Sequence, residues 1–420
     1  MAIWKKISTW VPFGGGTTPQ KGDTPKPPAG EAVKQPLTPQ MIENLKREVA
    51  RYDDILKVKP EDLEIQLKLG ETWMKLERYG EALKPFRAIL TARPDHASAL
   101  FHIAECYINT GRDEQALEVL ETARKLNPES QALVRMLAQA HTNLCVTYGK
   151  LRRYEDSTQH FQEALALIPD FGPAHLAMGL NLLQQGRYDD AIKMFLKTIE
   201  LDPNLLVEAH HHLARAYAKK GQIKKAFKHF NEAIQANPKA AVVHQDLGEF
   251  QFKLGKFDEA VTAFENALAM SPRLTADAWF KLGIARVKLN RTRAAEEPLR
   301  KALELTPENE QVQNGLTEVL FRIHQLDRKE GHGQASFQLL REAVRINPTH
   351  AKAQLALGVL YDQKSDGQKA IRHVLFAKNF FLEQKDKEGL AKAIKLLNAL
   401  YPKYKLTPED FEKLIMPSRS

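Results

Sequence analysis

Histidine is the residue type whose number and spacing in this chain most suggest chemistry. Four histidines recur at intervals of 34 or 35 residues, at His141, His175, His210 and His244, and two more histidines directly follow His210. Imidazole nitrogens bind Zn²⁺ and related cations when several ligands converge within about 2.1 Å of one ion. A metal centre is therefore the first hypothesis, and it depends on whether the fold brings these rings together.

Other catalytic chemistry has weaker support. Cys106 and Cys145 are the only two cysteines, too few for a disulfide framework or a four-thiolate zinc site. We expect them to pack as small apolar groups in a reducing compartment. The sequence contains no GxxxxGK[ST] or GxGxxG loop, no GxSxG elbow and no HExxH motif. We therefore predict a protein that is not an enzyme, with no catalytic residue and no cofactor.

The elements that must position the histidines are indicated by a repeat of prolines. Nine prolines follow one another at intervals of 34, 35 or 41 residues: Pro60, Pro94, Pro128, Pro169, Pro203, Pro238, Pro272, Pro307 and Pro348. Proline cannot continue a helix, but it is favoured in the first turn of the next one. Midway between prolines lie Gly111, Gly186, Gly221 and Gly255, where a helix C-terminus favours a left-handed residue. Each unit is thus predicted to be helix, tight turn, helix.

This unit resembles the tetratricopeptide repeat (TPR) family. When the closing position of each repeat is numbered 32, eight repeats have small residues at positions 8 and 20 and an apolar, mostly large residue at position 24. In the unit that closes at Pro203, these positions are Gly179, Ala191 and Phe195. The resemblance covers about residues 61–382, with about nine repeats. It implies an all-α, right-handed α-solenoid of antiparallel helix pairs that binds other proteins.

Two repeats, the third and the eighth, are each seven residues longer than the rest. Seven residues are almost two helical turns, so an insertion within a helix keeps the same face inward. No helix breaker lies between Glu129 and Tyr148, so we expect a longer first helix in the third repeat. In the eighth, residues 329–334 (KEGHGQ) predict a longer turn instead.

The chain divides into five predicted segments. Solenoid ends need caps because terminal repeats have no neighbour to cover their apolar face. The predicted segments are an amphipathic docking peptide (1–13), a Pro/Gly-rich flexible linker (14–37), an N-terminal capping helix (38–60), the TPR solenoid (61–382) and C-terminal capping helices (383–420).

In a stacked solenoid, the metal hypothesis fails on distance. The four spaced histidines share position 4 of successive repeats, and such positions lie on the order of 10–20 Å apart, given helices packed about 8–10 Å apart. Neighbouring side chains on a helix point about 100° apart, so His210, His211 and His212 cannot converge either. We therefore predict packed or solvated histidines and no metal site.

The remaining candidate surface is the concave groove that the TPR resemblance implies. In that family, positions 2, 5, 9 and 12 of the first helices point into the groove. The implied partner groove comprises Phe101, Ile108, Val146, Leu176, Leu180, Leu183, Arg215, Phe252, Phe280, Ile284 and Val287. It contains two apolar stripes at i, i+4, i+7, which begin at Leu176 and Phe280. The alternative is that these side chains pack on a neighbouring helix or on the chain's own tail.

Some TPR domains bind the C-terminal carboxylates of heat-shock chaperones through Lys at position 5 and Asn at position 9. No repeat in this chain has that pair of residues. A role as an adaptor for chaperone tails is therefore disfavoured.

The first thirteen residues form a cationic amphipathic pattern. Lys5 and Lys6 lie opposite an apolar set made of Ile3, Trp4, Ile7, Trp10, Val11 and Phe13. Such a segment can lie at a membrane interface. It can equally dock in a groove of another protein or of this one, or have no function.

Net charge gives little support to nucleic-acid binding. The chain carries +9, but residues 41–340 are neutral and the excess lies at the two ends. We predict a cytoplasmic scaffold that binds apolar or helical peptide segments of partner proteins and assembles a multiprotein complex. The alternative is a membrane-peripheral organiser attached to the inner membrane through residues 1–13. Polyanion binding through the basic ends ranks below both, and self-association stays open.

Overall fold

The computed structural model describes residues 37–271 and 275–411. The predicted docking residues Ile3, Trp4, Ile7, Trp10, Val11 and Phe13 lie outside the described residues, and so does almost all of the predicted linker. The chain separates into two compact units, residues 1–236 and 237–420.

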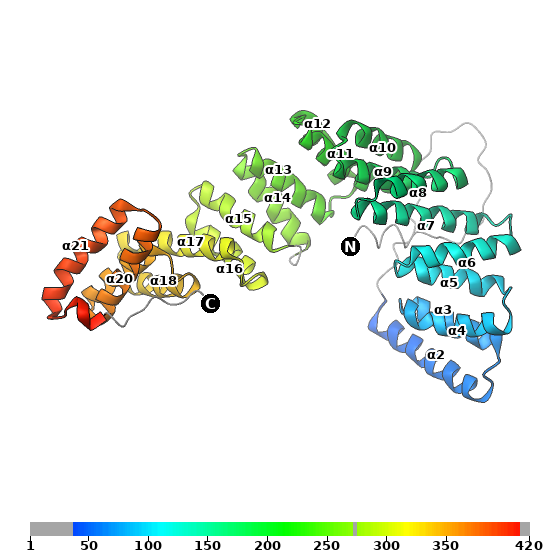
Figure 1. The fold of residues 1–420 in the computed structure, drawn as a ribbon, viewed down its shortest axis with the longest axis horizontal. Coiled ribbons are helices and arrows are strands. Elements are labelled where there is room, and N and C mark those ends of the chain that lie inside the picture. Colours follow the sequence, from blue (N-terminus) through cyan, green and yellow to red (C-terminus); the bar gives the residue numbers. More distant parts are fainter. Residues whose placement is uncertain (1–36, 272–274, 412–420) are drawn as a thin grey trace. The chain divides into compact units, whose positions relative to one another are not determined.

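In the first unit, helices pack in chain order, each against the next, and short turns join them (Figure 1). Its α-helices are α2 (Pro39–Val58), α3 (Leu63–Lys75), α4 (Tyr79–Ala92), α5 (Ala97–Asn109), α6 (Asp113–Leu126), α7 (Gln131–Lys150), α8 (Tyr154–Leu167), α9 (Gly172–Gln184), α10 (Tyr188–Leu201), α11 (Leu206–Lys219) and α12 (Ile223–Ala236). A short 3₁₀ helix, η1 (Pro203–Leu205), precedes α11.

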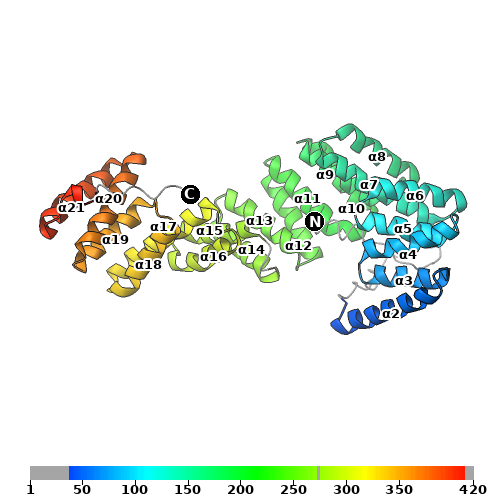
Figure 2. The same ribbon diagram turned by 60° about the horizontal axis from the view of Figure 1, so that its bottom comes forward.

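The second unit repeats the arrangement, and Figure 2 shows its helices from a second side. Its helices are α13 (Ala241–Lys253), α14 (Phe257–Met270), α15 (Ala276–Lys288), α16 (Thr292–Leu305), α17 (Glu310–Lys329), α18 (Gly333–Ile346), α19 (Ala351–Gln363), α20 (Gly367–Glu383) and α21 (Lys387–Tyr404), followed by the 3₁₀ helix η2 (Pro408–Phe411). No strand occurs in residues 37–271 and 275–411, so the all-α helix-pair fold is confirmed.

In several helix pairs, a large side chain of the second helix packs on a glycine of the first. A Cβ atom placed on Gly179 would lie 2.5 Å from the ring of Phe195, and one on Gly248 would lie 2.9 Å from Phe264. Both phenylalanines are completely buried. The small residue at position 8 is therefore required because position 24 occupies the space where its side chain would be.

Both longer repeats accommodate their seven extra residues in a longer first helix. The predicted long first helix of the third repeat is confirmed, since α7 has 20 residues where α9 has 13. The predicted long turn of the eighth repeat is wrong, because α17 also has 20 residues and continues to Lys329. Only Gly331 is left-handed in the turn that follows, with a φ of 86°. The helix continues because nothing between Asn309 and Lys329 breaks it.

The two ends of the described chain carry further helices. The hydroxyl group of Thr38 accepts a hydrogen bond from the Met41 N–H at 3.3 Å and caps α2, with Pro39 in its first turn. At the other end, α21 packs on α20. Capping helices are predicted over residues 383–420; after α21 the structure has only the single 3₁₀ turn η2, and residues after Phe411 lie outside the described part.

Candidate interaction pocket and histidine cluster

A pocket of about 610 Å³ opens in the first unit, beside α7, α9, α10 and α11. Its apolar wall is formed by Val146, Leu180 and Leu183. Its polar lining consists of Lys150, Asn181, Gln184, Gln185, Gly186, Tyr188, Arg215 and Lys219. The pocket therefore combines a small apolar surface with three basic side chains and no acidic one.

The cations of the pocket are positioned by the helices that carry them. Arg215 lies one turn after His212 on α11, and its guanidinium donates to His212 Nδ1 at 3.5 Å. Complete burial holds the pKa of His212 well below its ordinary value, so this ring is neutral and accepts the hydrogen bond. Lys150 is exposed as a whole, but the atoms packed around its ammonium group lower its pKa. Positive charge thus lies beside the apolar wall.

Four of the eleven predicted groove residues meet in this pocket: Val146, Leu180, Leu183 and Arg215. Leu180 and Leu183 are half-buried, and both also pack against the core of the first unit. Leu176, which belongs to the same stripe, has no exposed surface. The stripe is therefore divided, with Leu176 in the core and the next two leucines at the pocket.

The other predicted groove residues lie elsewhere. On α5, Phe101 is half-buried and Ile108 is 7% exposed, and both belong to a separate core cluster. The members in the second unit are half-buried against hydrophobic core clusters of that unit: Phe252, Phe280, Ile284 and Val287. These positions serve helix packing here, which agrees with the alternative considered from the sequence. Whether any of them contacts a partner stays a prediction.

Comparison with family models identifies the architecture. The model described as the cilia and flagella-associated protein 70 C-terminal domain, a TPR domain, matches residues 172–394, slightly more than half of the chain. Two tetratricopeptide-repeat models match residues 74–140 and 46–97. The chain belongs to the TPR family.

Among TPR relatives, the BBSome complex member BBS4 of Bos taurus is 30% identical over 155 residues, which cover 37% of this chain and 28% of that protein. The Hsp70-Hsp90 organizing protein of Triticum aestivum is 27% identical over 103 residues, 24% of this chain and 18% of that protein. The chain thus spans less than a third of the length of these relatives. The crystal structure of yeast Tom70 aligns over 87% of both chains with 15% identity and a TM-score of 0.43.

The two thiols of this TPR chain are buried, as predicted. Burial raises the pKa of Cys106 to about 12 and that of Cys145 to about 11. Both groups are therefore protonated near neutral pH, and a protonated thiol is a poor nucleophile.

A further feature repeats within the TPR units and joins positions 4, 11 and 23. In the third repeat, His141 Nδ1 lies 3.0 Å from His160 Nδ1, and Tyr148 stacks on His160. The fifth and ninth repeats have the same arrangement, with His210, Tyr217 and His229 in one and Gln354, Tyr361 and His373 in the other. Equal positions in different repeats do not meet in this way; the pairing joins the two helices of one repeat, and it was not predicted from the sequence.

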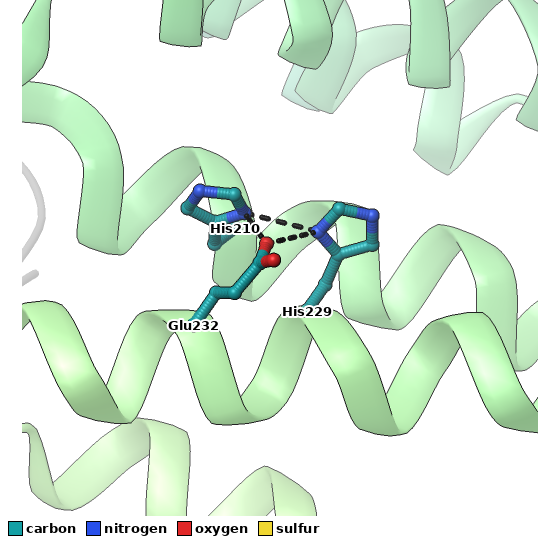
Figure 3. A group of neighbouring side chains, drawn as sticks. All are labelled: His210, His229 and Glu232. Carbon is teal, nitrogen blue, oxygen red and sulfur yellow. Dashed lines mark hydrogen bonds and ion pairs between the residues drawn. The ribbon is translucent and has the colours of Figure 1, made fainter.

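The fifth repeat adds a carboxylate to its histidine pair (Figure 3). Glu232 Oε2 lies 3.0 Å from His210 Nδ1 and 3.1 Å from His229 Nδ1. His210 comes from α11, while His229 and Glu232 lie one turn apart on α12. The sequence prediction excluded convergence for equal positions of different repeats and for His210, His211 and His212, and it did not consider His210 with His229. The 19-residue spacing, shared with His141 and His160, was the signal that could have revealed it.

The ninth repeat makes stability depend on pH. Burial lowers the pKa of His373 to about 4, whereas an unfolded chain would have a histidine pKa of about 6.5. Between these values the unfolded chain binds a proton that the folded chain does not, so stability falls as pH decreases from about 6.5 to 4. We expect this residue to contribute up to about 3 kcal/mol of that loss. His373→Gln should flatten the slope of the unfolding free energy against pH, measured by urea titration from pH 7 to 4. An unchanged slope in this variant would contradict the assignment.

Proposed function

We propose that the chain is a protein-interaction scaffold, and that the pocket beside α7, α9 and α11 binds a partner peptide carrying an apolar side chain next to an acidic group. One observation carries the proposal: an apolar wall lies beside three basic side chains, and no acidic side chain lines the pocket. The scaffold role is supported by the family and by the names of the relatives, one a member of a complex and one an organizing protein.

The chemistry of the pocket supports both halves of this ligand. Removing an apolar side chain from water is favourable by roughly 25 cal/mol per Å² of buried surface. Lys150, Arg215 and Lys219 attract an acidic partner from a distance and disfavour basic ones. An acidic side chain or a C-terminal carboxylate beside an apolar anchor would satisfy both requirements.

Residues 1–13 match this ligand poorly. They contain Lys5 and Lys6 and no acidic residue, so their charge is like that of the pocket. This charge disfavours docking of the N-terminal peptide into the chain's own pocket. Attachment of that peptide to a membrane or to another protein stays a prediction. No helix within the described residues is long and apolar enough to span a bilayer.

The test uses peptides selected from a display library of random short sequences against the full chain. We expect selected peptides to combine an apolar residue with a nearby acidic one. The double variant Arg215→Glu with Lys219→Glu should raise their Kd roughly 10–100-fold, because attraction becomes repulsion. Fluorescence anisotropy of labelled peptides measures this change, and added salt should weaken binding to the unchanged chain.

The matched control is Lys84→Glu with Lys224→Glu, which makes the same charge change at exposed positions outside the pocket. This control should leave the Kd within about twofold of the unchanged chain, since distant exposed charges are screened. If both double variants weakened peptide binding equally, the effect would come from the net charge of the protein and not from the pocket. The pocket would not be the proposed binding site if the selected peptides lacked acidic residues. The same conclusion would follow if neither double variant changed the Kd.

A further inference from the structure

We propose that His210, His229 and Glu232 form a binding site for a divalent transition-metal cation, best matched by Zn²⁺, with one coordination position left open. This inference replaces the prediction that the histidines bind no metal. It concerns α11 and α12 of the fifth repeat and uses none of the side chains that line the pocket.

The distances fit a tetrahedral ion. Ligands at about 2.0–2.1 Å from Zn²⁺ lie about 3.3–3.4 Å from one another. The three ligand atoms here are separated by 3.0 Å between the two Nδ1 atoms and by 3.0 and 3.1 Å from each Nδ1 to Glu232 Oε2. Moving each pair apart by about 0.3 Å would place an ion at their centre, which small side-chain rotations can supply.

His210 Nδ1, His229 Nδ1 and Glu232 Oε2 make three close pairwise contacts, but two neutral imidazoles supply too few N–H groups for a hydrogen bond in each contact. A neutral imidazole carries one N–H, and an Nδ1 proton points toward only one of its two neighbours. The Glu232 carboxylate only accepts. A cation at the centre would contact all three atoms at once, and two imidazoles with one carboxylate are ligands that Zn²⁺ accepts.

The surroundings of the three ligands allow a metal ion to bind and dissociate. The side chains of His210, His229 and Glu232 are 16%, 11% and 33% exposed, so an ion can reach them from solvent. Burial lowers the pKa of both histidines, which keeps the rings neutral and their lone pairs available near pH 7. Tyr217 stacks on the His229 ring with a centroid separation of 5.3 Å and fixes its orientation.

The same chain supplies a natural comparison. The third repeat has the identical histidine pair, with Nδ1 atoms 3.0 Å apart and Tyr148 stacked on His160. Within the described residues, no carboxylate completes a group of three around that pair. Glu163 follows His160 by three residues, as Glu232 follows His229, but its carboxylate does not lie within such a group. The third repeat therefore gathers two ligand atoms where the fifth gathers three.

The other convergent group, at Asp327, Glu330 and His332, already binds a cation of the protein. The guanidinium group of Arg293 donates to Asp327 at 2.8 Å and to Glu330 at 2.6 Å. That group binds Arg293, and we assign no metal to it.

The experiment titrates Zn²⁺ into the untagged full chain after removal of bound metal with a chelator. We expect one tight equivalent by isothermal titration calorimetry, and visible absorption bands of a four-coordinate ion when Co²⁺ replaces Zn²⁺. Glu232→Gln, which keeps the shape of the side chain, and His229→Gln should each weaken the tight equivalent roughly 10–100-fold or more. Zn²⁺ should raise the Tm of the unchanged chain but not that of Glu232→Gln.

The matched control is His160→Gln in the third repeat, which should leave the tight equivalent and the Co²⁺ spectrum unchanged. Circular dichroism of each metal-free variant verifies that the helices are intact. The proposal fails if the unchanged chain shows no one-to-one binding, or if Glu232→Gln binds Zn²⁺ as tightly as the unchanged chain. It also fails if His160→Gln removes the tight equivalent.

Discussion

Phe195→Ala should destabilise the first unit by about 3–5 kcal/mol, the usual effect of removing a buried phenylalanine. Phe195 has no exposed surface, packs on Gly179 and stacks on the His212 ring with a centroid separation of 5.6 Å. Its loss would leave a cavity at the contact between α9, α10 and α11. Since a typical domain is stable by only about 5–15 kcal/mol, this is a large fraction of the total.

Urea unfolding followed by circular dichroism measures the effect, and hydrogen exchange locates it. Because repeats stabilise one another through nearest-neighbour contacts, faster exchange should spread from α10 to α9 and α11. The adjacent residue provides the control, since Leu196 is 42% exposed and Leu196→Ala should change stability by less than about 0.5 kcal/mol. Equal losses in the two variants would contradict the packing described for α10.

Gly149→Ala should cost about 2–4 kcal/mol although alanine is the better helix former. A Cβ atom at Gly149 would overlap the side-chain amide of Asn181, which is 2% exposed. That amide donates to the Cys145 carbonyl oxygen at 2.9 Å and to Ser157 Oγ at 2.5 Å. The Asn181 side chain could move away only by giving up these buried hydrogen bonds between α7, α8 and α9.

Thermal and urea unfolding of the variant measure the cost. The control is Gly80→Ala in the first turn of α4, where a Cβ atom would meet nothing within 4 Å. At that position only the higher helix propensity of alanine should matter, so Gly80→Ala should stabilise the first unit by about 0.5–1 kcal/mol. Opposite signs for the two glycine variants are thus expected. A stabilising Gly149→Ala would show that α7 and α9 do not approach as closely as described.

The repeat could be predicted from the sequence because the residues that define it lie close together along the chain. Proline, the glycine of the turn and the small and large residues at positions 8 and 24 lie within one helix pair, where chain connectivity already places them close together. The extra helical turns of α7 follow from the absence of a breaker. The same rule applied to α17, and the error in the eighth repeat came from giving Gly331 and its neighbours more weight than the unbroken helix before them.

The pocket could be anticipated only in part. Leu176, Leu180 and Leu183 form one stripe in the sequence, but Leu176 is fully buried while the other two line the pocket. Exposure of a groove position depends on the crossing of neighbouring repeats and on the size of side chains across that contact. A periodic pattern does not contain this information. Lys150 and Lys219 lie at the C-terminal ends of their helices, and only the packing of α7 and of α11 against α9 places them at one pocket.

The sequence by itself determined the family, the helix pairs and the burial of Cys106 and Cys145, because these follow from spacing and side-chain size along one stretch of chain. Only the tertiary structure decided which groove positions stay accessible and which histidines meet. His210 and His229 are 19 residues apart and belong to different helices, so their Nδ1 atoms reach 3.0 Å only through the antiparallel packing of α11 on α12. Glu232 lies one helical turn after His229 on the same face of α12 and joins them, whereas Glu163, at the same spacing after His160, does not join the histidine pair of the third repeat.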